Sequence, residues 1–382
     1  MRPSLVLDAG SYSLSRWKVG GIGLRAAELA DALAADCRVR VLVRDDDEDL
    51  LPLGEAEAVR AADWARVLAE SHAAVFFDDP DRTRLEQAAA SATLVVSENV
   101  APIEHAEYPS LLASPDPAKA HRELVATYTR QLALSDHFLC RSEVERATLV
   151  SNLCLTGAFG PADIARSRTL EHLVSLVPIG FSARSARTAT TVTATHLADF
   201  LWTGGIWNFY DPVTFVRALA RCREEGLPAT GAFLHAAPVT DNADLVASVH
   251  REVDRLGLGD AVRLLTEPIP HEARDAYLLG ARGLVCLGKP GAENQTCVRL
   301  RIRDNRLLGV PLVVDAHGAT AREAAEGGVR AHVLPEATPE AVADVLAELM
   351  RGPAPGAAHI HEDFCYDHRL RGFLSWLTTA LA

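Results

Sequence analysis

The stretch GLVCLGKPGAENQTCVRLRIRDNRLLGVPLVV, residues 283–314, decides the fold that the sequence predicts. It begins with an apolar run typical of a buried strand, enters a loop broken by glycine and proline, and ends in a second apolar run. Between the two runs, the carboxylate of Glu293 is followed by several arginines, among them Arg299 and Arg301. In an open α/β sheet, ligands bind at the carboxyl ends of the strands. A carboxylate among guanidinium groups suits a sugar joined to phosphates, because carboxylates accept from hydroxyl groups and guanidinium groups bind phosphate oxygens in pairs.

The rest of the chain repeats this alternation of short apolar runs and helical segments, which is typical of a parallel, doubly wound sheet. We therefore predict an α/β protein with two Rossmann-like domains facing each other across a cleft. The predicted parts are a first domain at 1–180, a connector rich in Ser, Thr and Ala at 181–198, a second domain at 199–358, and a C-terminal helical segment at 359–382 that packs back on the first domain.

Composition narrows the class of protein. The formal net charge of −13 argues against a nucleic-acid-binding protein or a general membrane-surface protein, because there is no basic surplus to neutralise phosphates. No apolar run approaches the roughly 20 residues of a membrane span, and the N-terminus lacks the pattern of a signal peptide. The seven cysteines include no CxxC pair, so we expect reduced thiols, no metal site and a cytoplasmic location.

Two glycine-containing loops follow predicted strands and precede predicted helices. Gly20 and Gly21 lie in VGGIG, and Gly204 and Gly205 lie in TGGIW. Glycines let the backbone approach a phosphate or a sugar, and a helix N-terminus offers free N–H groups. Neither loop has the GxGxxG pattern, so a nicotinamide dinucleotide is not favoured. Simple tight turns are the alternative interpretation.

Polar groups also end two strands of the first domain. Asp79 and Asp81 form an Asp-x-Asp pair that would suit Mg²⁺ or Mn²⁺, although a polar strand end explains the pair as well. The segment SENVAPIEHAEY (97–108) would face a ligand as acceptor-binding or acid–base groups, with an ordinary polar loop as the alternative. Its candidate residues are Glu98, Asn99, His105 and Tyr108.

Four stretches together resemble the GT-B glycosyltransferases, and in particular an atypical bacterial branch of the retaining glycosyltransferase family 4. They are DHFLCRSEVER with LVSLVPIGF, LWTGGIWNFYDPVTFVRAL, PIPHEARDAYLLGARGLVCL and ENQTCVRLRIRDNRLLGVPLVV. The resemblance covers most of the chain. It implies that the first domain binds the acceptor and that the second binds a nucleotide-diphosphate sugar, a UDP- or GDP-sugar, with no tightly bound cofactor and no metal.

The resemblance also assigns roles, with two departures from the usual pattern. The family's two glutamates are separated by seven residues, but here that count from Glu293 reaches Arg301, so the second acid corresponds to Asp304. The family's phosphate-binding Arg and Lys are absent after the strand at 199–205, so other cations must bind the diphosphate. The implied catalytic residues are Glu293, Arg299 and Arg301. The implied donor-binding residues are Gly20, Gly21, Gly204, Gly205, Lys289, Gly291, Asn294, Gln295 and Asp304.

The resemblance implies transfer of a sugar with retention of its anomeric configuration. We expect a small soluble acceptor, such as an intermediate of an antibiotic or another secondary metabolite. The sequence leaves the oligomeric state open, including a homo-oligomer. The alternatives are a nucleotide-sugar epimerase, another enzyme with this fold such as a phosphorylase, or a non-catalytic nucleotide-sugar-binding partner subunit.

Overall fold

The computed structural model describes residues 2–98, 103–327, 330–353 and 356–382. The chain forms two compact units. Unit 1 contains residues 1–106, 116–185 and 362–382, and unit 2 contains residues 107–115 and 186–361. The chain therefore enters unit 2 briefly at Glu107–Pro115 before it returns to unit 1, and its last segment also belongs to unit 1.

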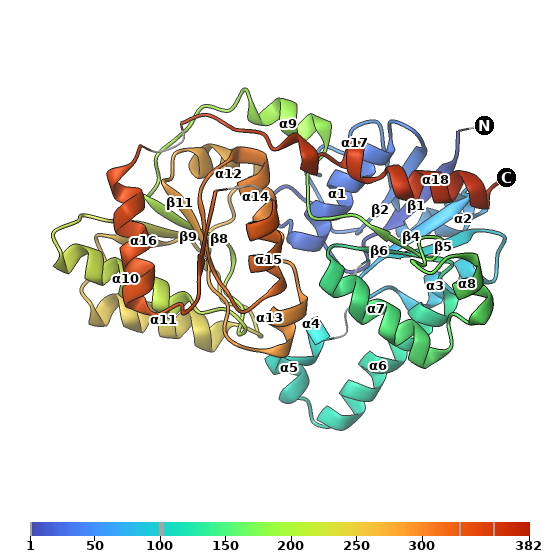
Figure 1. Ribbon diagram of the computed structural model, residues 1–382, viewed down its shortest axis with the longest axis horizontal. Helices are drawn as coiled ribbons and strands as arrows, with labels where there is room; N and C mark the ends of the chain where they lie inside the picture. Colours follow the sequence, from blue (N-terminus) through green and yellow to red (C-terminus); the bar gives the residue numbers. More distant parts are fainter. Residues whose placement is uncertain (1, 99–102, 328–329, 354–355) are drawn as a thin grey trace. The chain divides into compact units, whose positions relative to one another are not determined.

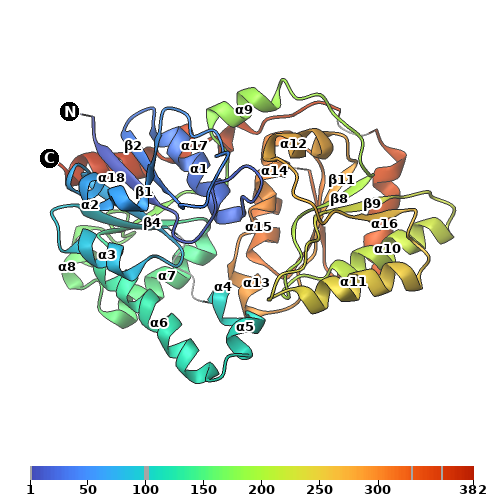
Figure 2. The ribbon, with the colours of Figure 1, turned by 180° about the vertical axis from the view of Figure 1, so that it is seen from behind.

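Unit 1 is built on a seven-stranded parallel sheet with the order β3-β2-β1-β4-β5-β6-β7. The strands are β1 Ser4–Asp8, β2 Arg38–Val43, β3 Glu57–Arg60, β4 Ala73–Phe77, β5 Leu94–Glu98, β6 His137–Cys140 and β7 Val174–Leu176. Its helices include α1 Gly21–Leu33, α2 Trp64–Ala69, α3 Arg82–Ala89, α6 Pro117–Leu134, α7 Glu143–Thr156, α17 Tyr366–Arg369 and α18 Arg371–Ala380. Helices α1, α17 and α18 cover one face, and α3, α6 and α7 cover the other (Figure 2). The short helices α4 Ile103–Ala106 and α8 Pro161–Arg166 complete the unit.

Unit 2 is built on a six-stranded parallel sheet with the order β10-β9-β8-β11-β12-β13. Its strands are β8 Phe200–Gly205, β9 Gly231–His235, β10 Val262–Leu264, β11 Gly283–Cys286, β12 Leu312–Asp315 and β13 Ala331–Leu334. Its helices include α5 Pro109–Leu112, α10 Pro212–Glu224, α11 Ala243–Arg255, α12 His271–Leu279, α13 Ala292–Thr296, α14 Arg301–Leu308, α15 Ala319–Glu326 and α16 Pro339–Arg351. Helices α10, α11 and α16 cover one face, and α12, α14 and α15 cover the other (Figure 1). Helix α9 Ala183–Ala189 spans the boundary between the units.

The prediction of two doubly wound α/β sheets is confirmed. In each sheet the chain proceeds outward in one direction and then reverses. The reversal lies between β1 and β4 in unit 1 and between β8 and β11 in unit 2. At such a switch point the loops leaving two neighbouring strands diverge, and ligands bind at the carboxyl ends there.

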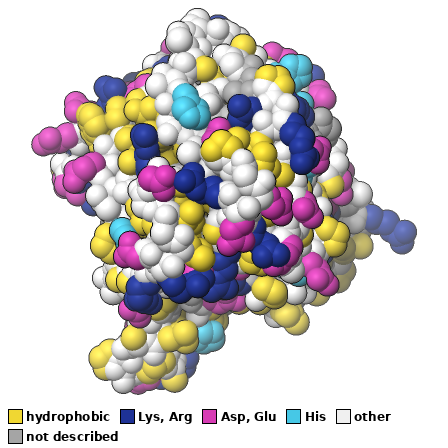
Figure 3. All heavy atoms as spheres, turned by 90° about the vertical axis from the view of Figure 1, so that its left-hand side faces the viewer, with side chains coloured by type: hydrophobic (Ala, Val, Ile, Leu, Met, Phe, Trp, Pro, Cys, Tyr) yellow, Lys and Arg dark blue, Asp and Glu magenta, His cyan; other side chains and the backbone are white. Residues whose placement is uncertain are grey.

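Local sequence explains how the helices of unit 2 begin. Asp211 caps α10 by accepting from the backbone N–H of Thr214 at 3.1 Å, and Pro212 occupies the first helical position, where no N–H is needed. Thr338 caps α16 in the same way. The two helices lie side by side, and Arg221 of α10 pairs with Glu340 of α16 at 3.0 Å. Side chains of both charges lie among apolar ones on this side of the unit (Figure 3).

The core of unit 2 is aromatic where β8 and β9 meet α10. Trp202 is fully buried and packs against Phe233 at 5.6 Å and Phe215 at 6.4 Å between ring centroids. Full burial of each such ring contributes roughly 1.5–3 kcal/mol to folding. Tyr210, in the loop that leaves β8, packs on the same indole ring at 5.6 Å between ring centroids.

The C-terminal segment is joined to unit 1 through buried polar contacts. The hydroxyl of Tyr366 accepts from Arg25 Nη1 at 2.8 Å and from the backbone N–H of Gly180 at 2.9 Å. Arg25 also forms a buried ion pair with Glu98 and donates to the carbonyl of Val177. One arginine on α1 thus ties β5, the end of the β7 segment and α17 together.

His137 gives unit 1 a predictable dependence of stability on pH. The side chain is fully buried under Trp376, and burial lowers the pKa of its imidazole to about 4. In the unfolded chain a histidine binds a proton near pH 6.5. The contribution of His137 to the unfolding free energy is therefore fully present above that pH and is lost as the pH falls toward 4.

We expect the His137→Gln protein to show a shallower loss of stability between pH 6.5 and 4. The slope of unfolding free energy against pH should fall by up to about 1.4 kcal/mol per pH unit, one proton's contribution. Urea unfolding at several pH values measures this slope. The exposed His121 provides the control, as its replacement by Gln should leave the slope unchanged; equal slopes for His137→Gln and wild type would contradict the assignment.

Candidate functional site

The switch point of unit 2 brings together the loops that follow β8 and β11. The backbone N–H of Asp211 donates to the carbonyl of Leu287 at 3.0 Å, and that of Lys289 donates to the carbonyl of Phe209 at 2.9 Å. Tyr210 and Gly288 form an isolated antiparallel bridge between the same loops. Each loop is therefore held by the other, directly beyond the strand ends.

The end of β12 holds the loop from a third side. Asp315 accepts from the backbone N–H of Gly288 at 2.6 Å and from Asn294 Nδ2 at 3.2 Å. A Cβ on Gly288 would lie 2.3 Å from Asn294 Nδ2, so only glycine fits there. Asn294, predicted to bind the donor, thus fixes the shape of the loop that carries Glu293.

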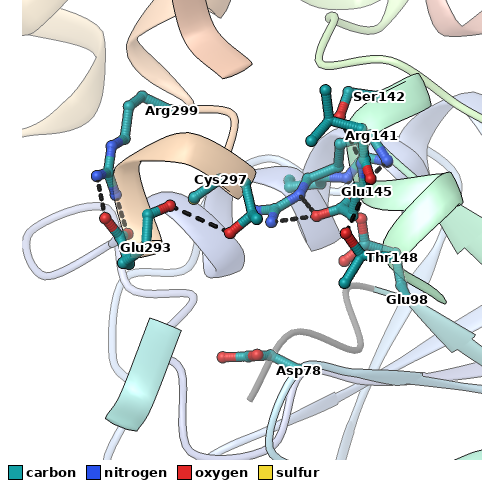
Figure 4. A network of polar contacts seen from close by, with 12 residues as sticks. Asp78, Glu98, Arg141, Ser142, Glu145, Thr148, Glu293, Cys297 and Arg299 are labelled. Atoms are coloured by element: carbon teal, nitrogen blue, oxygen red, sulfur yellow. Dashed lines mark hydrogen bonds and ion pairs between the residues drawn. The ribbon is translucent and has the colours of Figure 1, made fainter. Parts of the chain in front are cut away.

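Glu293 lies on α13 and forms a buried, two-pronged ion pair with Arg299 (Figure 4). The side chains are 1% and 6% exposed, and Arg299 Nη2 also lies 3.4 Å from Asn294 Oδ1. Burial acts against the charge of Arg299, but Tyr210, Cys297 and Glu293 outweigh it and raise the pKa of the guanidinium. The sequence predicted both residues for one site, and the structure joins them directly.

Arg299 and Arg301 both stack on aromatic rings supplied by the β8 side. The guanidinium carbon of Arg299 lies 4.3 Å from the ring centroid of Phe209 and 4.8 Å from that of Tyr210. Arg301 lies 4.1 Å from Tyr210 and 4.6 Å from Trp202. Stacking of this kind fixes the planes of the two guanidinium groups while leaving N–H donors at their edges.

Arg301 differs from its neighbours in having no carboxylate partner among the residues that the structure describes. Its Nη2 donates to the carbonyl of Gly205 at 2.7 Å, whereas its Nη1 is buried without a hydrogen-bond partner in the described part of the chain. A Cβ on Gly204 would lie 2.7 Å from Arg301 Nε, so this glycine makes room for the guanidinium. A buried donor left unpaired is unfavourable by about 1–3 kcal/mol, so this N–H group would gain from a hydrogen-bond acceptor.

Two histidines beside these arginines are held neutral. Burial lowers the pKa of His235 to about 4, and Arg274 and Arg301 add to the effect. Burial also lowers the pKa of His271 well below its ordinary value, with Arg303 and Arg274 contributing. Neither imidazole therefore supplies a proton near pH 7.

Asp304 lies in the first turn of α14 with its carboxylate bound inside unit 2. Arg274 of α12 donates to both of its oxygens, one at 2.9 Å, and Arg303 Nη1 lies 3.3 Å from it. The predicted role of Asp304 in binding the donor stays a prediction. The sequence reasoning missed Arg274, because nothing in the spacing of PHEARD shows that α12 packs against α14.

The remaining predicted donor residues lie around the same loop. Lys289 Nζ donates to the carbonyl of Asn208 at 3.0 Å and stays exposed, as does Gln295. Gly291 precedes α13 as its N-cap. Gly205 is limited by the indole of Trp207, from which an added Cβ would be 2.9 Å. Gly204 and Gly205, predicted to lie in a loop, are the last two residues of β8, and both accommodate side chains of this unit.

Gly20 and Gly21 lie in unit 1 at the exposed start of α1. Gly20 is the N-cap and no side chain caps this end, so the first backbone N–H groups are available to a ligand. The glycine that packing requires in this region is Gly23, because a Cβ there would lie 2.2 Å from the carbonyl oxygen of Ser13.

The switch point of unit 1 is occupied by Asp78, which follows β4. Its carboxylate accepts from Tyr12, from Tyr128 at 3.0 Å, and pairs with His105 Nε2 at 2.8 Å. Its φ of 42° is in the left-handed region, which is unfavourable for a residue other than glycine and common at functional sites. His105 was a predicted site residue and Asp78 was not, although the position of Asp78 directly after a buried strand was the available signal.

The predicted acceptor residues are divided between the two units. Glu98 is buried against Arg25, and burial raises the pKa of its carboxyl while Arg25 opposes that shift. His105 belongs to unit 1, and Tyr108 belongs to unit 2. Asn99 lies outside the described residues.

The Asp-x-Asp pair has a structural explanation at one of its members. Asp81 caps α3 by accepting from the backbone N–H of Arg84 at 2.9 Å. Within the described residues, no group of three or more His, Cys, Asp or Glu side chains is arranged to hold a metal ion. In the same ranges, every helix is too short or too polar to cross a membrane.

Comparison with known proteins identifies the fold. No protein-family model and no curated protein matches the sequence significantly. Among solved structures, HepE from Anabaena in complex with UDP and glucose superposes with a TM-score of 0.62 at 15% identity, covering 99% of this chain and 100% of that one. A trehalose 6-phosphate synthase from Burkholderia multivorans gives a TM-score of 0.61 at 12% identity, covering 100% and 99%. WaaG, a glycosyltransferase of lipopolysaccharide biosynthesis, gives 0.57 at 12% identity, covering 98% of each chain. The chain therefore has the fold of GT-B glycosyltransferases.

Proposed function

We propose that this protein is a retaining glycosyltransferase that moves a sugar from a UDP-sugar to a small soluble acceptor without a metal ion. Unit 2 binds the nucleotide sugar at its switch point, and unit 1 binds the acceptor near Asp78 and His105. The resemblance of the sequence to family 4 enzymes supports the retaining mechanism. The presence of UDP in the similar HepE structure supports the choice of base.

One observation carries the proposal, namely the buried guanidinium of Arg301 with its unpaired Nη1 at the switch point of unit 2. A diphosphate oxygen there would satisfy the donor and bring the negative charge that the site lacks. The stacking of Arg301 on Tyr210 fixes the group before the ligand arrives, so little reorganisation accompanies binding.

Glu293 provides the complementary function toward the sugar. Its carboxylate accepts from Arg299, and a carboxylate oxygen can accept more than one hydrogen bond, including one from a sugar hydroxyl. The pair thus places a hydroxyl acceptor and a phosphate donor side by side, as the junction between sugar and diphosphate requires.

In the proposed reaction, the bond between the sugar's anomeric carbon and the phosphate oxygen breaks toward an oxocarbenium-like transition state. Negative charge then grows on the departing diphosphate, and Arg301 with Arg299 stabilises it. The acceptor hydroxyl attacks from the same face, and its proton passes to the departing phosphate oxygen. Neutral His235 and His271 are not required for this transfer.

A thermal-shift screen against UDP, GDP, ADP and dTDP in EDTA tests the proposal. We expect UDP to raise the melting temperature most, because a ligand at 100 times its Kd stabilises the native state by about 2.7 kcal/mol. No shift with any nucleotide would contradict nucleotide-sugar binding, and a shift that required Mn²⁺ would contradict metal independence. Release of UDP from a UDP-sugar by the purified protein would then exclude a non-catalytic binding subunit.

A further inference from the structure

Two residues from the first half of the chain, Glu107 and Tyr108, are built into unit 2 beside the Glu293–Arg299 pair. Glu107 Oε1 accepts from the backbone N–H of Glu293 at 3.2 Å. The Glu107 carbonyl accepts from Asn208 Nδ2 at 2.7 Å. Glu107 is therefore anchored through its backbone and presents its side chain to the first turn of α13.

The neighbouring Tyr108 fastens the same segment to the aromatic side of the site. Its ring stacks on Trp207 at 6.2 Å and on Phe209 at 6.5 Å. Phe209 is the ring on which Arg299 stacks, at 4.3 Å. The segment thus contacts the surroundings of both members of the ion pair.

The glycine that precedes α13 lies next to the Glu107 carboxylate. A Cβ at Gly291 would lie 3.5 Å and 3.7 Å from the two carboxylate oxygens of Glu107. Farther along, the backbone N–H of Ser110 donates to Asp241 Oδ1 at 2.6 Å, which fixes the outer end of the segment on unit 2. The segment is thus fixed on unit 2 at Glu107, Tyr108 and Ser110.

We propose that Glu107 is a positioning residue for the donor sugar, acting through Glu293. This inference rests on the proposed function, in which the Glu293 carboxylate binds sugar hydroxyls. The hydrogen bond from the Glu293 N–H to Glu107 sets the first turn of α13 and hence the direction in which the Glu293 carboxylate leaves the backbone. Small displacements of a positioning group have large effects on binding and reaction.

Glu107 should affect the binding of the sugar and not the binding of the nucleotide. Arg301, which we assign to the diphosphate, is held by Gly205, Trp202 and Tyr210 and does not depend on Glu107. Loss of the Glu107 acceptor should therefore weaken the contribution of the sugar to binding and leave the binding of UDP itself unchanged.

The test compares Glu107→Ala, Glu107→Gln and wild type by titration calorimetry with UDP, UDP-glucose, UDP-galactose and UDP-N-acetylglucosamine. For the UDP-sugar that wild type binds most tightly, we expect Glu107→Ala to raise the Kd about 10-fold, which corresponds to about 1.4 kcal/mol. The Kd for UDP should stay within about 2-fold of the wild-type value, less than the effect of one hydrogen bond. Glu107→Gln should restore tight binding, because its amide oxygen can accept from the same N–H. Glu348→Ala, an exposed glutamate on α16, serves as the matched control.

Other results of this titration would overturn the inference or the proposed function. Equal weakening for UDP and the UDP-sugar would show a general disturbance of the site and overturn the inference. A Glu107→Gln protein as weak as Glu107→Ala, or a Glu107→Ala protein equal to wild type, would also overturn it, as would wild-type binding of UDP-sugars no tighter than UDP. A wild-type protein that bound neither UDP nor any UDP-sugar would contradict the proposed function itself.

Hydrogen exchange gives a readout that does not depend on any ligand. In Glu107→Ala, the amide of Glu293 should exchange faster than in wild type, whereas Glu107→Gln should retain the wild-type rate. Unchanged exchange in Glu107→Ala would remove the physical basis of the inference.

Discussion

Replacement of Arg301 with Met is expected to weaken UDP binding about 10- to 100-fold while leaving the protein as stable as wild type or more stable. A hydrogen bond from a charged donor contributes about 1.5–3 kcal/mol, which accounts for the loss of affinity. Methionine retains the length and apolar character needed to pack on Trp202 and Tyr210. Stability is maintained because the substitution removes a buried guanidinium that has no carboxylate partner in the described structure.

Weaker UDP binding together with unchanged stability distinguishes a group that binds the ligand from one that supports the fold. Arg306 on the same helix is equally buried, but it pairs with Glu323 at 2.9 Å. Arg306→Met should therefore lower the unfolding free energy, because it leaves a charged partner behind, without changing the Kd for UDP. Urea unfolding and calorimetry on the two variants measure both quantities. If Arg301→Met bound UDP as wild type does, the diphosphate would have to be assigned to other cations.

Replacement of Glu293 with Ala is expected to abolish sugar transfer and also to lower the unfolding free energy by about 3–5 kcal/mol. Removing one member of a buried pair leaves an uncompensated charge, here that of Arg299. Activity must therefore be measured under conditions in which the variant is folded.

A double variant separates the two effects of the pair. Glu293→Gln combined with Arg299→Met removes both charges, so we expect it to recover most of the lost stability and remain inactive. Circular dichroism during urea unfolding gives the stability, and release of UDP from the donor gives the activity. A stable double variant with wild-type turnover would show that the pair supports the fold and takes no part in transfer.

The segment around Glu293 shows how far sequence reasoning reached. The spacing of apolar runs on either side predicted two buried parallel strands, and β11 and β12 confirm it. The same pattern placed Glu293 and Arg299 in one loop. It did not show that they pair, because two side chains six residues apart in an irregular loop have no fixed distance.

Contacts between segments that are far apart in the chain could not be predicted from the sequence for a similar reason. Asp304 pairs with Arg274, and Glu107 binds the Glu293 amide, across separations of 30 and 186 residues. No local periodicity carries such information. For Asp78, the sequence shows a carboxylate directly after a buried strand, but only the sheet order shows that this strand end lies at the switch point between β1 and β4.

The sequence by itself determined the two doubly wound sheets, because strand and helix periodicities are local and are repeated along both halves of the chain. It also determined the loop that carries the candidate site, since glycine, proline and charge cluster at a strand end. Only the tertiary structure decided which of the arginines pair with a carboxylate and which one, Arg301, has no carboxylate partner among the described residues. That choice depends on which carboxylates the folded chain brings within hydrogen-bond distance, and in a buried site such distances decide whether a charge stabilises the fold or remains for a ligand.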